Sequence, residues 1–437
     1  MIFQIQKVLT ITLCAFVFVS CTSDRSSSRS HEHAQNGILF IIDGMGPAHI
    51  TAARIFKNNS DTPLAMESME HLAMARTHST NNFVTDSAAS ATALASGVKT
   101  YNGAIGMTDA NFDPSETSQK LQSITDLSLE SNRAVGIVTN TRITHATPAA
   151  FFAHVPHRRL EAEIARQLAT RSEIDLVIGG GLEFFLPKEE GGERVDGLNL
   201  IEKMREQGRK VVTSHEEFKQ LNPREINQNL VVILEFDHLA YEFKRADEEV
   251  SLSQITDFSI EFLEQRGKSK SGYFLMVEAG RVDHASHMNW TEKMLEDMVE
   301  ADRSIETILS KTQDSNDTLV IVTADHETGG LSLQGYAPHS AVAGRGILKN
   351  HSRDVRQDAY VYGVVSWGSG PGYDSPLEAD ADDPKFRHKA TYPTPVAYHT
   401  AVDIPTLAHG PGAFQINGYI DNTDIFRAMK NALKLID

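Results

Sequence analysis

Cysteine is almost absent from this sequence. The 437 residues include two cysteines, Cys14 and Cys21, and both lie within the first 21 positions. Because a disulfide needs two cysteines that can approach each other, none can form within the body of the protein. The folded part must therefore be stable without covalent cross-links.

Positive charge is also scarce. Lys and Arg together number 41 and Asp and Glu number 58, so the formal charge is 41 − 58 = −17 with histidine neutral. Such a surface repels nucleic acid and anionic lipid, and we expect no nucleic-acid partner. An anionic ligand would need a site that supplies its own positive charge. Charged residues at 23% and hydrophobic residues at 41% are typical of a folded protein and not of a disordered one.

The N-terminal hydrophobic run is short. Residues 8–19 are almost wholly apolar, follow Lys7 and precede Ser20, and they are too few to span a bilayer as a helix. This three-part pattern is typical of a secretory signal, and we predict that residues 1–20 form one. A poor membrane anchor is the alternative. The protein is expected to be exported, to the periplasm or the cell surface.

A lipid anchor is predicted directly after this segment. The tetrad at 18–21, Phe-Val-Ser-Cys, resembles a bacterial lipobox with Phe18 where Leu is usual, so Cys21 would carry the lipid. Residues 21–36 are Ser-rich and polar, as a tether between a lipid and a folded domain would be. An ordinary cleaved signal is the alternative interpretation.

From residue 37 to 437 the pattern fits one folded domain. Short apolar runs of strand length alternate with amphipathic stretches, of which 291–311 and 160–168 have helical spacing. Strands that are continuously apolar belong to parallel sheets covered by helices. We therefore predict an α/β fold, a mostly parallel central sheet with helices on both faces. The expected strands are 37–42, 134–138, 174–178, 230–234, 273–277 and 319–322.

One segment differs from this pattern. Residues 331–398 are rich in Gly, Pro, Asp and His, with a single short apolar run near Val361. We predict a loop-rich cap or crown-like insertion that lies over the site or meets a second subunit.

Three predicted strands end in possible metal ligands. Asp43 follows the first, Glu278 follows another, and Asp325 and His326 follow a third. In open α/β sheets ligands bind at the carboxyl ends of the strands. One acidic residue there usually caps a helix or turn, but three such endings with histidine beside them favour a metal site.

Two further residues could bind a metal together. Asp283 and His287 are four apart, so on a helix they lie on one face. A solvated helix start explains that pair equally well. His399 could complete the site from a distance, although alone it is one of 18 histidines.

A candidate nucleophile precedes a helix of small residues. Ser87 begins a stretch rich in Ala and Ser that ends at Gly97, and the N-terminus of a helix favours an anion. Most such serines are only caps. A serine hydroxyl needs a base or a metal to become a nucleophile. Since no histidine neighbours Ser87 in sequence, a metal is the better explanation. Arg158 could clamp an oxyanion with its planar fork.

Taken together, these segments resemble the alkaline phosphatase family. The similar pieces occur in family order from about residue 37 to the C-terminus, and those around Ser87 and Asp325 are highly specific. They are residues 43–46, 85–93, 97–104, 147–150, 278–287, 323–330 and His399.

The resemblance implies hydrolysis of phosphate monoesters through a phosphoserine on Ser87, with release of inorganic phosphate. It also implies two Zn²⁺ and one Mg²⁺ per chain, and Arg158 bound to the phosphate oxygens. One Zn²⁺ would be held by Asp283, His287 and His399, the other by Asp43, Asp325 and His326, and the Mg²⁺ by Asp43, Thr147 and Glu278. Imidazole suits Zn²⁺ and an all-oxygen set suits Mg²⁺, so the ligand types agree with these roles.

Two substrate-side positions depart from the best-known enterobacterial form. His145 and His284 stand where that form has an aspartate and a lysine, and the same histidine pair is typical of animal members. Without an acid at 145 the surroundings of the third metal suit hydrated Mg²⁺ less well. We therefore expect that site to accept Zn²⁺ or Co²⁺ in part.

Other functions compete with a phosphomonoesterase. A phosphodiesterase or a sulfatase of the same superfamily would share the metal ligands, and a lipid-anchored binder of phosphate or metal would need no nucleophile. Members of the family are usually homodimers, so the resemblance also implies a homodimer.

Overall fold

The computed structural model describes residues 33–58, 61–109, 118–243, 245–313, 315–335, 343–354, 357–376, 383 and 385–436. The predicted signal at 1–20, the predicted lipid attachment site Cys21 and most of the predicted tether lie outside these residues. None of the described helices combines the length and the hydrophobicity that a membrane span requires.

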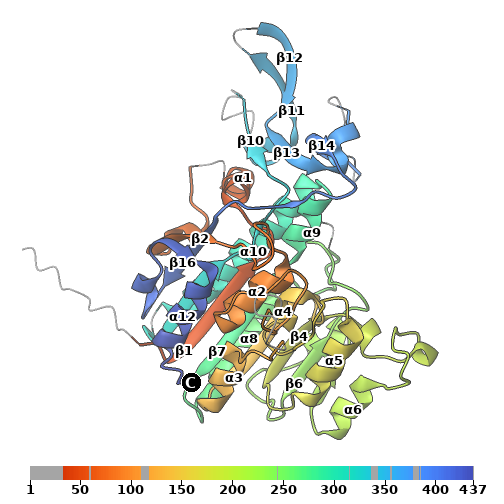
Figure 1. The fold of residues 1–437 in the computed structure, drawn as a ribbon, viewed down its shortest axis with the longest axis vertical. Helices are drawn as coiled ribbons and strands as arrows, with labels where there is room; N and C mark the ends of the chain where they lie inside the picture. The colour runs from red at the N-terminus through yellow and green to blue at the C-terminus, as the bar shows by residue number, and fades with distance from the viewer. Residues whose placement is uncertain are drawn as a thin grey trace, which may run out of the picture.

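A ten-stranded sheet forms the centre of the molecule (Figure 1). Every strand is parallel to its neighbours except β16, which runs antiparallel to both β2 and β8. The predicted mostly parallel sheet is therefore confirmed. In spatial order the strands are β17 (Gly418–Asp421), β2 (His71–Arg76), β16 (Ile404–His409), β8 (Thr318–Thr323), β1 (Asn36–Ile42), β7 (Tyr273–Ala279), β3 (Ala134–Arg142), β4 (Leu176–Gly180), β6 (Leu230–Ile233) and β5 (Lys210–Val212).

The central strands are hydrophobic because both of their faces are covered. All residues of β1, β7 and β8 are buried. Their side chains therefore do not alternate between solvent-exposed and buried positions along the strand. On one side α8 (Leu252–Gly267) packs on β3 and β7, and α10 (Thr291–Thr312) packs on α8 and on α1 (Pro47–Asn58). A second group lies on the other face (Figure 1) and consists of α2 (Ser87–Ser96), α3 (Ile124–Glu130), α4 (Ala146–Ala149) and α12 (Asn422–Ala432).

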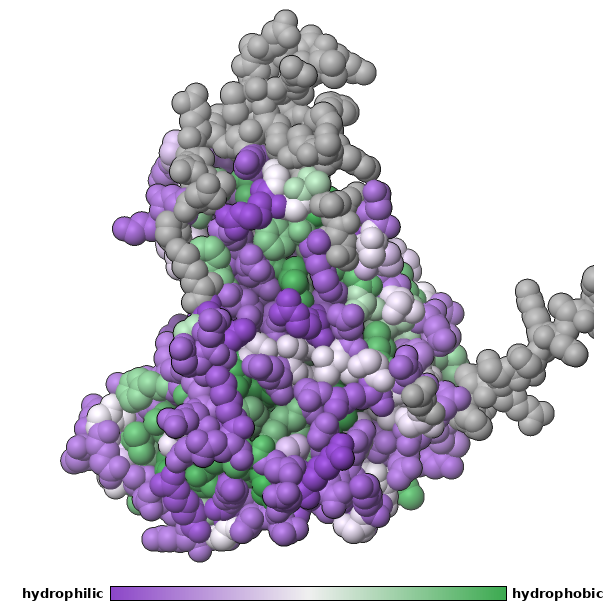
Figure 2. All heavy atoms as spheres, turned by 180° about the vertical axis from the view of Figure 1, so that it is seen from behind, coloured by the Kyte–Doolittle hydropathy of each residue, from purple (hydrophilic) through white to green (hydrophobic). Residues whose placement is uncertain are grey.

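The remaining helices are short or peripheral. They are α5 (Glu161–Thr170), α6 (Leu200–Glu206), α7 (His215–Lys219) and α9 (Arg281–His287). The face of the molecule opposite to that of Figure 1 is mainly hydrophilic, with hydrophobic residues exposed in small groups between charged ones (Figure 2).

Helix α2 shows how local sequence fixes an element near the site. Asp86 caps its N-terminus by accepting a hydrogen bond from the backbone of Ala89, and Gly97 ends it with φ +71°. A Cβ on Gly97 would meet the ring of Phe426 at 2.5 Å. Residues 87–95 are all buried, so small side chains are needed around the whole circumference of this helix.

Residues 331–398 contain more regular structure than their composition indicates. Besides loops, the described part of the segment holds short strands: β10 (Ser332–Leu333), β13 (Val365–Gly370) and β14 (Ala390–Pro393) form one small sheet, and β11 (Asn350–Asp354) pairs with β12 (Gln357–Gly363). Trp367 is buried and donates its indole N–H to Thr291 Oγ1 at 3.1 Å. The segment is thereby attached to the start of α10.

Candidate metal centre and active site

The site lies where three neighbouring parallel strands end. Glu278 near the end of β7 is paired in register with Ile41 of β1, which on its other side is paired with Thr323 of β8. Asp43 directly follows β1, and Asp325 and His326 follow β8. All four of these polar side chains are fully buried. The strand ends thus collect three carboxylates and an imidazole in one buried region.

A first ligand cluster consists of Asp283, His287 and His399. Their ligand atoms lie within 4.8 Å of one another. His287 Nε2 is 3.2 Å from Asp283 Oδ2 and 3.1 Å from His399 Nε2. His287 Nδ1 contacts the carbonyl of Ala397 at 2.6 Å, and His399 Nδ1 contacts that of Thr85 at 3.1 Å. Since a carbonyl only accepts, both Nδ1 atoms donate, and both Nε2 atoms point at the same place.

The charges in this cluster call for a cation. Burial disfavours charge on His287, but the Asp283 carboxylate outweighs burial and raises the pKa of His287 to about 9. Burial likewise opposes ionisation of Asp283, yet His287 and then His399 hold the pKa of Asp283 well below its usual value. A proton on His287 thus supplies the positive charge that a bound cation would otherwise bring.

A second cluster consists of Asp43, Asp325 and His326, again within 4.8 Å. His326 Nε2 is 3.1 Å from Asp325 Oδ2 and 3.7 Å from Asp43 Oδ1. Those two oxygens have no hydrogen-bond partner among the described residues. Burial, followed by the charges of Asp325 and Asp283, raises the pKa of Asp43 well above its ordinary value, and burial and Asp283 raise the pKa of Asp325 to about 7.

A third cluster shares Asp43 with the second. Glu278 Oε2 accepts hydrogen bonds from Thr139 and, at 2.9 Å, from Thr141, while its Oε1 has no partner among the described residues. Burial raises the pKa of Glu278 to about 7. Thr147 Oγ1 lies 3.5 Å from Asp43 Oδ2. His145 also reaches this group, so the structure places it beside the third cluster as well as beside Arg158.

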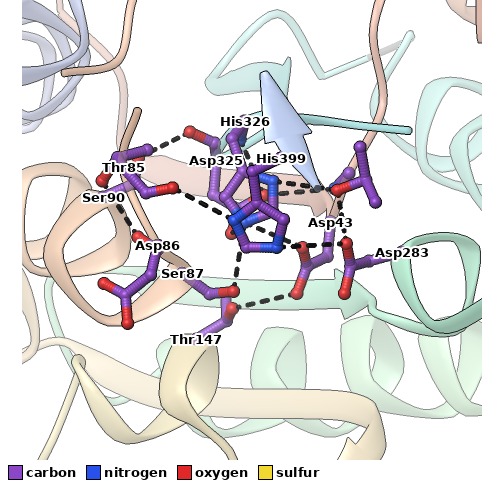
Figure 3. A network of polar contacts seen from close by, with 12 residues as sticks. Asp43, Thr85, Asp86, Ser87, Ser90, Thr147, Asp283, Asp325, His326 and His399 are labelled. Carbon is purple, nitrogen blue, oxygen red and sulfur yellow. Dashed lines mark hydrogen bonds and ion pairs between the residues drawn. The ribbon is translucent and has the colours of Figure 1, made fainter. Parts of the chain in front are cut away.

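Ser87 faces the second cluster from α2 (Figure 3). Its Oγ lies 3.2 Å from His326 Nε2, and its side chain is buried. The sequence shows no histidine near Ser87, but the fold brings one from 239 positions away. Burial and the neighbouring His399 lower the pKa of His326 well below its usual value. His326 is therefore neutral, with the lone pair that a metal ligand or a proton acceptor requires.

Arg158 is held by Asp86, the residue before Ser87. Its Nη1 donates to Asp86 Oδ2 at 3.2 Å, and its Nη2 lies 3.0 Å from His145 Nε2. Asp86 in turn accepts from the backbone N–H groups of Ala89 and Gly103. Asp86, the residue that precedes Ser87, thus fixes the arginine, and sequence reasoning did not single it out.

His284 belongs to a group of three histidines that includes one not anticipated from the sequence. The ring of His238 is centred 4.5 Å from that of His284 and 5.6 Å from that of His145. Burial lowers the pKa of all three histidines. Together with the charge of Arg281, burial lowers the pKa of His284 to about 3, and the charge of Arg158 adds to the effect of burial on the pKa of His145. All three are neutral at physiological pH. His238 follows β6 in an otherwise unremarkable loop, and no motif marks it.

The residues present fit divalent cations. Unpaired buried oxygens of Asp43, Glu278 and Asp325, together with converging imidazole nitrogens, repel one another unless positive charge lies between them. The first two clusters mix nitrogen and oxygen donors, and Asp43, Thr147 and Glu278 offer oxygen only, as Zn²⁺ and Mg²⁺ respectively prefer.

Comparison with known proteins agrees with this chemistry. A family model described as alkaline phosphatase matches residues 34–435. An alkaline phosphatase from Gadus morhua is 32% identical over 91% of both chains, and alkaline phosphatase 4 of Drosophila melanogaster is 30% identical over 91% of this chain and 76% of its own. Among solved structures, the alkaline phosphatase of the Antarctic bacterium TAB5 has a TM-score of 0.70 at 27% identity and covers 93% of this chain and 100% of that chain. The Thermus thermophilus enzyme has a TM-score of 0.71 at 25% identity, with 97% and 96% covered.

Replacing Glu278 by Gln tests the buried carboxylates through stability. The folded pKa of Glu278, about 7, exceeds its unfolded value of 4.5, so in metal-free protein stability is lost as pH rises between these values. Metal-free Glu278→Gln should therefore melt roughly 2–5 °C above metal-free wild type at pH 8, and the gap should close near pH 5. Scanning calorimetry of the two chelator-treated proteins at pH 8 and at pH 5 measures both melting-temperature differences.

Loading with metal provides the control for this variant. The wild-type carboxylate then binds a cation and Gln does not, so wild type should melt above Glu278→Gln at pH 8. A difference in melting temperature that stays the same at every pH, with and without metal, would contradict the role of Glu278 as a buried, metal-binding carboxylate.

Proposed function

This chain belongs to the alkaline phosphatase family and hydrolyses phosphate monoesters, and we propose that Ser87 is its nucleophile and Arg158 its phosphate clamp. The observation that carries the proposal is the convergence around Ser87 Oγ. His326 Nε2 lies 3.2 Å from it, Ser87 is the first residue of α2, and Arg158 donates to Asp86, the residue before Ser87.

The residues perform the reaction in two displacements. Arg158 binds two non-bridging oxygens of the phosphate with its fork, and the first backbone N–H groups of α2 favour the same anion. Ser87 Oγ forms a bond to phosphorus while the bond to the leaving-group oxygen breaks, which gives a phosphoserine and an alcohol that takes up a proton. Water then attacks phosphorus and releases Ser87 and inorganic phosphate.

The metal ligands are proposed as follows. Asp283, His287 and His399 would hold one Zn²⁺, Asp43, Asp325 and His326 a second, and Asp43, Thr147 and Glu278 a Mg²⁺. When bound, these cations lower the pKa of the nucleophilic hydroxyl and offset the charge of the entering and leaving oxygens. A protein of net charge −17 thereby gains a positive site for a phosphate dianion.

Replacing Ser87 by Ala tests the nucleophile. The variant should lose at least about 10³-fold in kcat on p-nitrophenyl phosphate while its zinc content is unchanged. Ser96→Ala, in the same helix with its hydroxyl bonded to the Thr92 carbonyl, should keep wild-type activity. The diester and sulfate analogues of the substrate should be hydrolysed far more slowly than the monoester. Faster turnover of either analogue would favour a phosphodiesterase or a sulfatase, and full activity of Ser87→Ala would exclude the phosphoserine.

The third site is proposed to accept Zn²⁺ or Co²⁺ in part. His145 reaches it as a neutral imidazole, since burial and Arg158 lower its pKa, and imidazole suits those metals better than Mg²⁺. A solved structure of a variant of the TAB5 enzyme, in which a histidine is replaced by aspartate, has Mg bound in its M3 site. In that enzyme, an aspartate in place of a histidine thus accompanies bound Mg.

Metal analysis after dialysis against Mg²⁺ tests this proposal. Wild type should keep Zn²⁺ or Co²⁺ in part of its third sites, whereas His145→Asp should bind one full Mg²⁺ per chain, because a carboxylate suits a hydrated Mg²⁺. Full and exclusive Mg²⁺ occupancy in wild type, with unimpaired activity, would overturn it.

Export, a lipid at Cys21, periplasmic or cell-surface location and a homodimer are also proposed. A relative from Bombyx mori is named a membrane-bound alkaline phosphatase, and the sequence offers an export signal and a lipobox-like tetrad. Small molecules that carry a phosphate monoester are the proposed partners of the site.

A single substitution addresses both the anchor and the assembly. Wild type should sediment with membranes after cell lysis, and Cys21→Ser should appear in the soluble fraction with unchanged kcat. Sedimentation equilibrium of that soluble variant should give twice the mass of one chain. Soluble wild-type protein would exclude the lipid, and a single-chain mass would exclude the dimer.

A further inference from the structure

Thr328 occupies the point where the elements of the first and second clusters meet. It is fully buried in β9 (Glu327–Thr328). Its backbone N–H donates to the carbonyl of Gly44 at 3.0 Å, and it is paired in register with His399 of β15 (His399–Thr400). Its main chain thus contacts the residue after Asp43 and the residue that supplies one ligand of the first cluster.

The side chain of Thr328 contacts a ligand from each cluster. Its Oγ1 lies 2.5 Å from Asp283 Oδ1 and 3.3 Å from His326 Nδ1. A threonine hydroxyl has one proton and can accept as well as donate. Since a carboxylate only accepts, the hydroxyl donates to Asp283, and the remaining contact requires His326 Nδ1–H to donate to Thr328.

This arrangement has consequences for both clusters. Asp283 Oδ1 is held by the hydroxyl, which leaves Oδ2 directed at His287 Nε2, 3.2 Å away. His326 carries its proton on Nδ1, so the lone pair of Nε2 faces Asp325 and the hydroxyl of Ser87 (Figure 3). One hydroxyl therefore fixes the rotation of a carboxylate in the first cluster and the tautomer of an imidazole in the second.

We propose that Thr328 is a positioning residue shared by the two metal clusters, and that its hydroxyl sets the zinc affinity of both. The inference rests on the proposed function, since it takes the ligand sets from there. A threonine in a buried strand is often present for its shape alone. Here the backbone already makes the strand contacts, and the hydroxyl reaches two ligands on two different elements, α9 and the end of β8.

Isosteric replacement separates the hydroxyl from the shape. Thr328→Val keeps the volume and the branch at Cβ but removes both contacts, and it should weaken zinc binding roughly 10–100-fold, the usual effect of losing a partner of a ligand. Thr328→Ser retains the hydroxyl and should stay within about threefold of wild type. Thr328→Ala also lacks the hydroxyl and has a smaller side chain, and its zinc affinity should decrease as much as that of Thr328→Val.

The chain offers a matched control for loss of a buried hydroxyl. Thr406 of β16 is fully buried and its Oγ1 contacts Thr323 Oγ1 at 2.8 Å. Among the described residues, neither hydroxyl forms a hydrogen bond with a member of the metal clusters. Thr406→Val should therefore bind zinc as wild type does, whatever it costs in stability.

The experiment is a zinc titration of chelator-treated full-length protein in competition with a chromogenic chelator. A second measurement is the zinc concentration that gives half-maximal hydrolysis of p-nitrophenyl phosphate, which should shift by the same factor while KM at saturating zinc stays constant. The proposal is supported if Thr328→Val and Thr328→Ala bind zinc more weakly while Thr328→Ser and Thr406→Val keep wild-type affinity for zinc.

Three results would overturn it. They are wild-type affinity in Thr328→Val, an equal loss in Thr406→Val, or an equal loss in Thr328→Ser. Asp283→Ala distinguishes these from failure of the proposed function itself: if that variant still binds two zinc ions with wild-type affinity, the ligand assignment is wrong and not merely the role of Thr328.

Discussion

The mutual repulsion of four buried carboxylates is the constraint around which this structure is arranged. Asp43, Glu278, Asp283 and Asp325 are all buried at the same edge of the sheet. Ionised carboxylates without partners are too costly to bury. For this reason the pKa values of Asp43, Glu278 and Asp325 are raised, whereas Asp283 stays ionised beside the protonated His287. Divalent cations remove this cost, so metal binding, stability and the attraction of a phosphate dianion all have one physical origin.

Hydrogen bonds determine which atoms remain available to the cations. Thr139 and Thr141 occupy one oxygen of Glu278 and leave the other free. Backbone carbonyls of Ala397 and Thr85 take the Nδ1 protons of His287 and His399. Small hydroxyls and carbonyls thus select the donor atoms, although none of them is a ligand in the proposed sets.

Much of the scaffold could be predicted because parallel strands buried on both faces need continuous apolar runs. The runs at 37–42 and 319–322 correspond closely to β1 and β8, whereas β3 extends to Arg142, four residues beyond its apolar run, since Thr139 and Thr141 face a buried carboxylate. The composition of 331–398 indicated loops but not the short strands among them. The sheet that contains β13 is attached to the start of α10 by the hydrogen bond from Trp367 to Thr291, a contact that the local sequence pattern does not indicate.

The sequence by itself determined the residue types of the site, since an acid at a strand end and a serine at a helix start are fixed by local pattern. Only the tertiary structure decided how they combine. The fold places His326 against Ser87 and makes Asp43 a member of two clusters. It also brings His238, Asp86 and Thr328, which sequence reasoning did not single out, into contact with residues of the site. The physical reason is that ligand geometry, tautomers and pKa values depend on neighbours hundreds of positions away, whose distances are set by the pairing of strands and the packing of helices.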